Sequence, residues 1–219
     1  MSSPLIVDYY SDVLCVWAWI AQRRIDELNK CLGDKIEIRY HYLDVFGDAV
    51  NKIPNQWHDR GDFEGFSAHV VESAFVYEDA LINADIWSKI RPTSSANPHL
   101  VLKAIELSYS CKQSIELALK FRQAFFVDAQ DISNIEILFA LIEQAGLDCT
   151  RVNKAILDGS AMAALMCNYQ QAKTLSLKGS PSYIIDNARQ ILYGNVGYRV
   201  LLANIEELLK KPISEASWC

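Results

Sequence analysis

A cysteine between an apolar run and an amphipathic segment is the feature that most constrains this chain. Residues 5–10 form a short apolar run typical of a buried strand, and residues 16–31 repeat apolar side chains at helical spacing. Cys15 therefore lies where a strand is followed by a helix, at the first helical turn. Free N–H groups and the positive end of the helix dipole meet there, and both favour the nucleophilic thiolate. The pattern predicts a reactive Cys15, although a buried cysteine that packs as a small hydrophobe fits it too.

The other elements predict an α/β protein whose sheet is split by a long helical stretch. Residues 36–43 alternate and indicate a second strand, so the chain begins with a β-α-β unit. Helical patterns then continue from about residue 66 to residue 177. Residues 182–185 and 190–193 indicate an antiparallel hairpin, and an amphipathic helix follows it. The order β-α-β, helices, β-β-α describes a small mixed sheet with a helical insertion.

The stretch over residues 44–66 is the hardest part of the chain to interpret. It mixes Pro54 and Gly61 with charges and Trp57, which favours a long loop before a helix over residues 67–82. Such a loop fits either a lid over the Cys15 end or a surface excursion with Trp57 packed onto the body. We favour the surface excursion.

Composition limits the function classes that remain open. The 219 residues carry a formal net charge of -6 without a basic cluster, which argues against nucleic-acid and anionic-membrane partners. The first residues lack a signal-peptide pattern, and no apolar run is long enough to span a membrane, so we expect a cytoplasmic location. The six cysteines show neither a C-x-x-C pair nor zinc-finger spacing, so we expect no metal site. Those on predicted helices, Cys31, Cys111, Cys149 and Cys167, are interpreted as structural fillers.

Three motifs carry a resemblance to a known family. Residues 12–19, read Asp-Val-Leu-Cys-Val-Trp-Ala-Trp, are similar to the D-x-x-C-P-W-C-[YF] active-site stretch of the DsbA-like thioredoxin-fold family. Residues 121–133 resemble its F-R-A-x-F…D-I-S region, and residues 179–186 resemble its G-x-P-[ST]-[FY]-x-[IV]-[DN] segment. The resemblance covers nearly the whole chain. It points to the cytoplasmic branch beside the 2-hydroxychromene-2-carboxylate isomerases and kappa-class glutathione transferases.

The resemblance implies a domain organisation and a substrate-binding loop. It implies a thioredoxin-like domain over residues 1–45 and 178–219, with a helical domain over residues 46–177 inserted. The family's proline at the position of Pro181 is cis and lies beside the reactive cysteine. The backbone of Ser180 would then pair with an extended thiol substrate, such as a peptide or glutathione.

The departures from the family's motif decide which chemistry remains. Ala18 replaces the second cysteine and Val16 replaces the proline, so the local resolving thiol of a C-x-x-C pair is missing. We therefore predict an oxidoreductase with Cys15 as its single nucleophile. Ser180, Pro181, Trp17 and Ala18 are expected at the substrate, glutathione is expected as a co-substrate, and no tightly bound cofactor is expected.

Two other functions stay open, together with the assembly and the chain end. A glutathione-dependent isomerase or transferase would use the Cys15 side chain to hold the glutathione sulfur. However, the kappa class has a Ser-Asp pair ahead of its last helix, where this chain has Asn195-Val196-Gly197-Tyr198. A non-catalytic binding module would hold a peptide at the Pro181 edge. A homodimer remains open, as does a role for Cys219 as a resolving thiol that folds back to Cys15.

Overall fold

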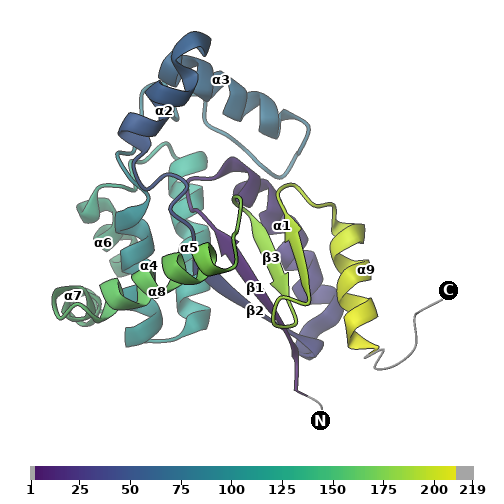
Figure 1. Ribbon diagram of the computed structural model, residues 1–219. Coiled ribbons are helices and arrows are strands. Elements are labelled where there is room, and N and C mark those ends of the chain that lie inside the picture. The colour runs from purple at the N-terminus through teal and green to yellow at the C-terminus, as the bar shows by residue number, and fades with distance from the viewer. Residues whose placement is uncertain (1–2, 211–219) are drawn as a thin grey trace.

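The computed structural model describes residues 3–210, and its sheet has the predicted α/β organisation (Figure 1). The elements that build the sheet layer are β1 (Leu5–Ser11), α1 (Val16–Leu32), β2 (Ile36–Tyr42), β3 (Ser182–Ile185), β4 (Gln190–Tyr193) and α9 (Tyr198–Leu209). Within the described residues the strands form a four-stranded sheet in the order β2-β1-β3-β4. β1 pairs parallel with β2 and antiparallel with β3, and β3 pairs antiparallel with β4. The predicted thioredoxin-like order β-α-β … β-β-α is therefore confirmed.

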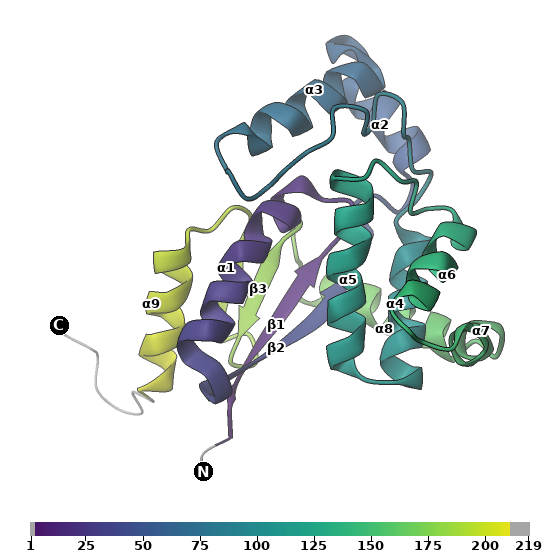
Figure 2. The ribbon, with the colours of Figure 1, turned by 180° about the vertical axis from the view of Figure 1, so that it is seen from behind.

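A block of helices separates β2 from β3 in the chain. These helices are α2 (Ala49–Trp57), α3 (Asp62–Phe75), α4 (Ala96–Ser108), α5 (Cys111–Phe126), α6 (Ile135–Gln144), α7 (Cys149–Leu157) and α8 (Ser160–Thr174). Figures 1 and 2 show α2 and α3 beyond the N-terminal end of α1, while α4 to α8 gather beside the sheet. The division of the chain into two domains remains a prediction.

Tyrosines on adjacent positions of β1 explain how the central strand is held on both faces. The Tyr9 hydroxyl lies 3.5 Å from the Ala18 carbonyl oxygen, on the face covered by α1. Tyr10 points to the opposite face, where its hydroxyl donates to Gln171 Oε1 of α8 at 3.3 Å. Since successive side chains of a strand alternate between faces, both sides of β1 are buried and its C-terminal end is fixed. The loop that carries Cys15 begins at this end.

The structure corrects the prediction for residues 44–66. This stretch contains α2 and the start of α3, although the sequence favours a long loop, and the helix predicted over residues 67–82 begins at Asp62 and ends at Phe75. Pro54 lies inside α2, where a proline removes one backbone donor. Trp57 packs against Phe66 of α3 with ring centroids 5.3 Å apart. Packing between the two helices outweighs the local preference, which the sequence pattern alone could not reveal.

Three of the four cysteines interpreted as structural fillers do not pack as the sequence suggests. Cys31, Cys111 and Cys167 are exposed, so this interpretation is wrong for them, whereas the half-buried Cys149 packs against the hydrophobic core. Cys219 lies outside the described residues. No helix within residues 3–210 has the length and apolar character that crossing a bilayer demands.

Candidate active site

Cys15 occupies the N-cap position of α1 and not a position inside the first turn. Its backbone is extended, with φ -82° and ψ 119°, and only 6% of the residue is exposed. Its thiol donates to the carbonyl oxygen of Ser180 at 3.3 Å. The strand-to-helix position predicted for this cysteine is therefore correct, and the sulfur faces the loop that precedes β3.

The loop that faces Cys15 contains a cis peptide bond between Ser180 and Pro181, as the resemblance implies. The Asp12 N–H donates to Ser180 Oγ at 2.9 Å, and the Gly194 N–H donates to the Pro181 carbonyl oxygen at 2.8 Å. The structure thus brings together residues that are 165 positions apart in the chain. The loop is held from the β1 end on one side and from the β4 end on the other.

Burial determines the protonation state of the Cys15 thiol. Burial raises the pKa of Cys15, and this effect exceeds the lowering by the Ser180 side chain and by the N–H groups of Ala18 and Trp17. The carboxylate of Asp12 raises the pKa further. The sequence predicts a thiolate stabilised by the helix terminus. This stabilisation is present, but desolvation of the buried charge outweighs it.

Asp12 is a fully buried carboxyl group directly before the site. Its Oδ1 accepts from the Leu14 N–H at 2.9 Å, and its Oδ2 accepts from the Phe46 N–H at 2.8 Å and the Ser95 hydroxyl at 2.7 Å. Burial raises the pKa of Asp12 to about 6, although these hydrogen bonds lower it. Asp12 therefore joins three segments of the chain beneath Cys15. In the sequence Asp12 stands out only as part of the motif over residues 12–19.

The other predicted site residues differ in accessibility. Ser180 and Trp17 are half-buried, whereas Pro181 is buried and Ala18 is fully buried. Since the Ala18 side chain is hidden, its contribution to the site comes through its backbone N–H. Trp19 packs in the core, because its ring stacks on Phe126 at 5.7 Å.

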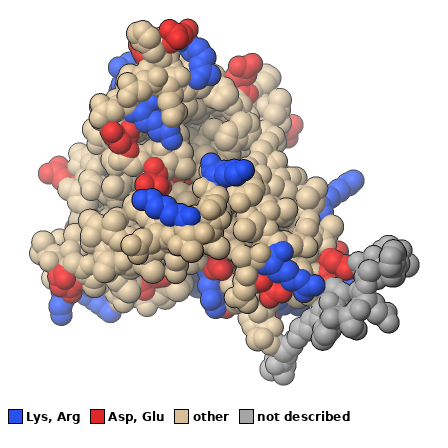
Figure 3. All heavy atoms as spheres, in the orientation of Figure 1, with Lys and Arg blue, Asp and Glu red and all other residues tan. Residues whose placement is uncertain are grey.

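The surface near the site is uneven and mixed in charge. Figure 3 shows a hollow in this face between the part formed by α2 and α3 and the rest of the molecule, with Lys or Arg side chains near its margin. A groove of about 510 Å³ also runs along α1, between Trp19, Arg24 and Tyr77. Within residues 3–210, no cluster of three or more His, Cys, Asp or Glu side chains could hold a metal ion.

The fold and the site together define a thioredoxin-fold protein with one cysteine at the start of its first helix and a cis-proline loop beside it. The model of the DSBA-like thioredoxin domain family matches residues 6–206, so the chain belongs to this family of thiol-disulfide oxidoreductases. It is 24% identical over 216 residues to the ClpXP adapter protein SpxH of Halalkalibacterium halodurans, and this match covers 94% of the chain and 68% of SpxH.

The solved structures that share this fold are named for different activities. The cytosolic disulfide reductase DsbM from Pseudomonas aeruginosa has a TM-score of 0.69 at 19% identity, with 93% of this chain and all of DsbM covered. A 2-hydroxychromene-2-carboxylate isomerase has a TM-score of 0.64 at 15% identity, with 94% of this chain and 97% of the isomerase covered. At these identities the likeness extends to the fold alone.

Proposed function

We propose that the protein is a thiol-disulfide oxidoreductase that uses Cys15 as its only nucleophile and forms mixed disulfides with glutathione. The observation that carries the proposal is the 3.3 Å contact between Cys15 Sγ and the Ser180 carbonyl oxygen of the cis-proline loop. This contact places the sulfur beside a loop that can pair with an extended substrate. A structure of DsbM with GSH, at a TM-score of 0.65, supports glutathione as the thiol to test first.

The missing second cysteine restricts the reaction to two exchange steps. The Cys15 thiolate attacks the glutathione sulfur of a mixed disulfide R–S–S–G, which forms Cys15–S–S–G and releases R–S⁻, and R–S⁻ then takes up a proton. A glutathione thiolate next attacks the glutathione sulfur of this adduct, which releases the Cys15 thiolate and forms oxidised glutathione. The net reaction reduces one mixed disulfide with one glutathione and needs no thiol at Ala18.

The backbone around Cys15 supports both steps. The N–H groups of Trp17 and Ala18 favour the charged sulfur, and the Ser180 side chain does so too. Their stabilisation applies when Cys15 is deprotonated for attack and again when it leaves the adduct. Because burial raises the pKa of Cys15, most of the protein carries the protonated thiol at neutral pH. We therefore expect turnover to rise with pH through the alkaline range.

The test follows Cys15 alone, in a variant whose other five cysteines are serine. The rate of alkylation by iodoacetamide is measured against pH, with and without glutathione, and adducts are detected by intact mass after treatment with oxidised glutathione. We expect a midpoint above the ~8.5 of a free thiol and a glutathione adduct that added glutathione removes. Absence of the adduct at every pH, including alkaline pH where the charged fraction of the thiol rises, would contradict the proposal.

A second function, that of a glutathione-dependent isomerase or transferase, is favoured by the hydrogen bond that the Cys15 thiol donates. The Cys15 thiol already donates a hydrogen bond, and a protonated thiol could donate in the same way to the sulfur of bound glutathione. That would suit a glutathione-dependent isomerase or transferase. Against it, the Asn195 side chain is occupied, since its Oδ1 accepts from Arg24 at 2.6 Å and its Nδ2 donates to Tyr77 at 2.7 Å. Protection of Cys15 by glutathione without an adduct would favour this function, and neither effect would indicate a non-catalytic binding module.

A further inference from the structure

The four backbone N–H groups that lead to the active-site cysteine are all paired. The Asp12 N–H donates to Ser180 Oγ, the Leu14 N–H donates to Asp12 Oδ1 at 2.9 Å, and the Cys15 N–H donates to the Asp12 carbonyl oxygen at 3.1 Å. The Val13 N–H donates to Nε2 of His99 at 3.1 Å. Three of these bonds stay within the loop and its cis-proline partner. The acceptor of the fourth bond, His99, lies on α4, 86 positions beyond Val13.

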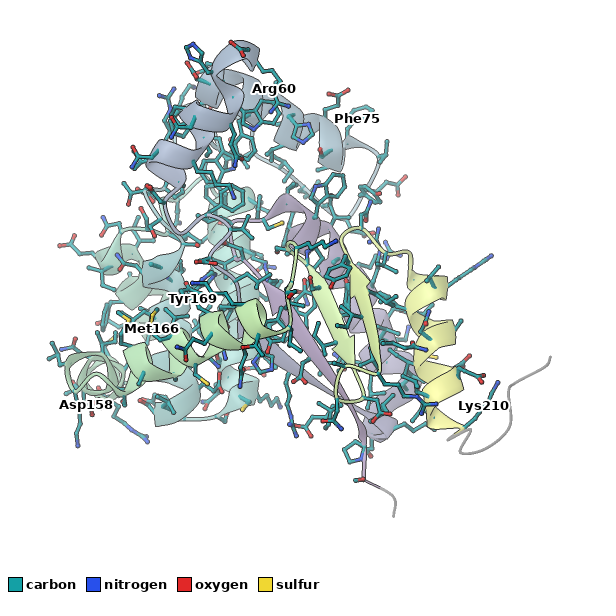
Figure 4. All side chains as sticks on the ribbon, viewed as in Figure 1. Arg60, Phe75, Asp158, Met166, Tyr169 and Lys210 are labelled. Carbon is teal, nitrogen blue, oxygen red and sulfur yellow. The ribbon has the colours of Figure 1, made fainter. Side chains whose placement is uncertain are left out.

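The ring of His99 is fixed on every side. It is fully buried and stacks on Tyr42 of β2 with ring centroids 4.7 Å apart. Its Nδ1 lies 3.2 Å from the hydroxyl of Tyr169, which Figure 4 labels on α8. Since Nε2 accepts from Val13, the ring proton must be on Nδ1, where it donates to the Tyr169 oxygen.

The charged groups around His99 favour this neutral form. Burial lowers the pKa of His99 well below its ordinary value, and the nearby cation of Arg122 lowers it further. Asp12 Oδ1 lies 3.8 Å from Nε2, but both atoms act as acceptors of other hydrogen bonds. The remaining titratable groups that face the ring, Tyr42 and Tyr169, have pKa values raised by burial and are neutral.

We propose that His99 is a positioning residue that fixes the main chain at Val13 through Nε2 and thereby sets the depth at which the Cys15 sulfur is buried. Without this acceptor, the Val13 N–H would be buried and unpaired, and the loop would move to reach water. Cys15 would then become more exposed, less well aimed at the Ser180 carbonyl, and easier to deprotonate. The prediction for turnover rests on the proposed function, whereas the prediction for thiol exposure does not.

The experiment compares three variants in the background that keeps Cys15 as the only cysteine. His99→Gln can place an amide oxygen near the position of Nε2, whereas His99→Asn reaches only the position of Nδ1, and His99→Phe keeps an aromatic ring without an acceptor. We expect Cys15 in H99N and H99F to be alkylated about tenfold faster at pH 7, with a lower midpoint. Turnover of the glutathione mixed disulfide should fall about tenfold in the same variants, and H99Q should stay close to the parent protein in both alkylation and turnover.

Opposite changes in alkylation and turnover separate positioning from a general loss of structure. Equal alkylation rates and midpoints in H99F and the parent protein would overturn the inference, as would an H99Q variant that behaves like H99F. If the variants do not fold, the imidazole nitrogens of His99 in the unsubstituted protein are followed by ¹⁵N NMR. We expect one tautomer, protonated on Nδ1, from about pH 5 to pH 8, and an ordinary titration there would overturn the inference. A protein without turnover whose variants still show the alkylation pattern would refute only the proposed function.

Discussion

Cys15 and Cys111 both lie at the start of a long helix, but they differ in their position relative to the N-cap and in which group the first backbone N–H groups face. Cys15 is the N-cap of α1, no side chain caps that helix, and its first N–H groups face the sulfur. Cys111 is one residue further on, inside α5, where the N-cap is Ser110 and its oxygen accepts from the Gln113 N–H. In α5 a hydroxyl therefore holds the place that Cys15 Sγ holds in α1. The first N–H groups of α1 therefore lower the pKa of a sulfur, whereas the N-cap of α5 is a serine hydroxyl.

The solvent accessibility of the two cysteines differs in the opposite sense to their contact with the helix terminus. Cys111 is exposed, whereas Cys15 is buried against the cis-proline loop. Cys149 offers a third case, since it begins α7 behind the N-cap Asp148. Burial raises its pKa, and the carboxylates of Glu143 and Asp148 raise it further. Of these three helix starts, the one at Cys15 combines an N-cap sulfur with a cis-proline loop in contact with it.

The largest effect is expected from removing the sulfur itself. Cys15→Ser should lower turnover of a glutathione mixed disulfide by about a thousandfold or more, because a serine hydroxyl is a far weaker nucleophile than a thiolate. Cys111→Ser is the matched control and should leave turnover unchanged. Turnover is measured as glutathione oxidation with hydroxyethyl disulfide. A similar loss in C111S would show that exposure and not the N-cap position decides reactivity.

Restoring a thiol at position 18 should change the product. Ala18 is buried one helical turn after Cys15, and its N–H donates to the Cys15 carbonyl oxygen at 3.1 Å and lowers the pKa of the Cys15 thiol. In Ala18→Cys we expect the Cys15–glutathione adduct to be resolved internally, with a mass lower by two hydrogen atoms in place of the adduct. Intact mass after treatment with oxidised glutathione measures this, with Ala18→Ser as the control for added volume. An adduct as persistent as in the parent protein would show that the backbone does not let the two sulfurs meet.

A smaller effect is expected from the Ser180 hydroxyl. Ser180 lowers the pKa of Cys15, and its Oγ accepts from the Asp12 N–H. In Ser180→Ala the pKa of Cys15 should rise further, so alkylation at neutral pH should slow about three- to tenfold. Ser180→Thr keeps the hydroxyl and should stay near the parent rate. If the alanine variant reacted as fast as the threonine variant, the Ser180 hydroxyl would have no effect on the reactivity of Cys15.

Local sequence patterns could predict the position of Cys15 but not its environment. The apolar run before Cys15 and the helical spacing after it are features of adjacent residues, and so is the proline directly before β3. The raised pKa of Cys15 depends on burial by segments far along the chain, including Ser180, 165 positions away. The role of His99 depends on a bond across 86 positions, and no spacing rule in the sequence could indicate it.

Packing also explains the other differences between expectation and structure. Pro54 has an unfavourable helix propensity, yet contacts such as the one between Trp57 and Phe66 place it inside α2. Cysteine is on average a buried residue, yet Cys31, Cys111 and Cys167 lie on the outer sides of their helices. Whether a residue faces the core or the solvent depends on which helix faces are covered, and the composition of one segment does not determine this.

The smallest predicted effect tests the α5 half of the comparison. Ser110→Ala removes the oxygen that accepts from the Gln113 N–H at 3.2 Å, which should lower the free energy of unfolding by about 1 kcal/mol. Ser110→Asp keeps an acceptor and adds a negative charge at the positive end of the helix, so it should retain the parent stability. Urea unfolding measures both variants, and the alkylation midpoint of Cys15 should be the same in each. If S110A instead changed the reactivity of Cys15, the two helix starts would be coupled, and the contrast between them could not be assigned to the N-cap position alone.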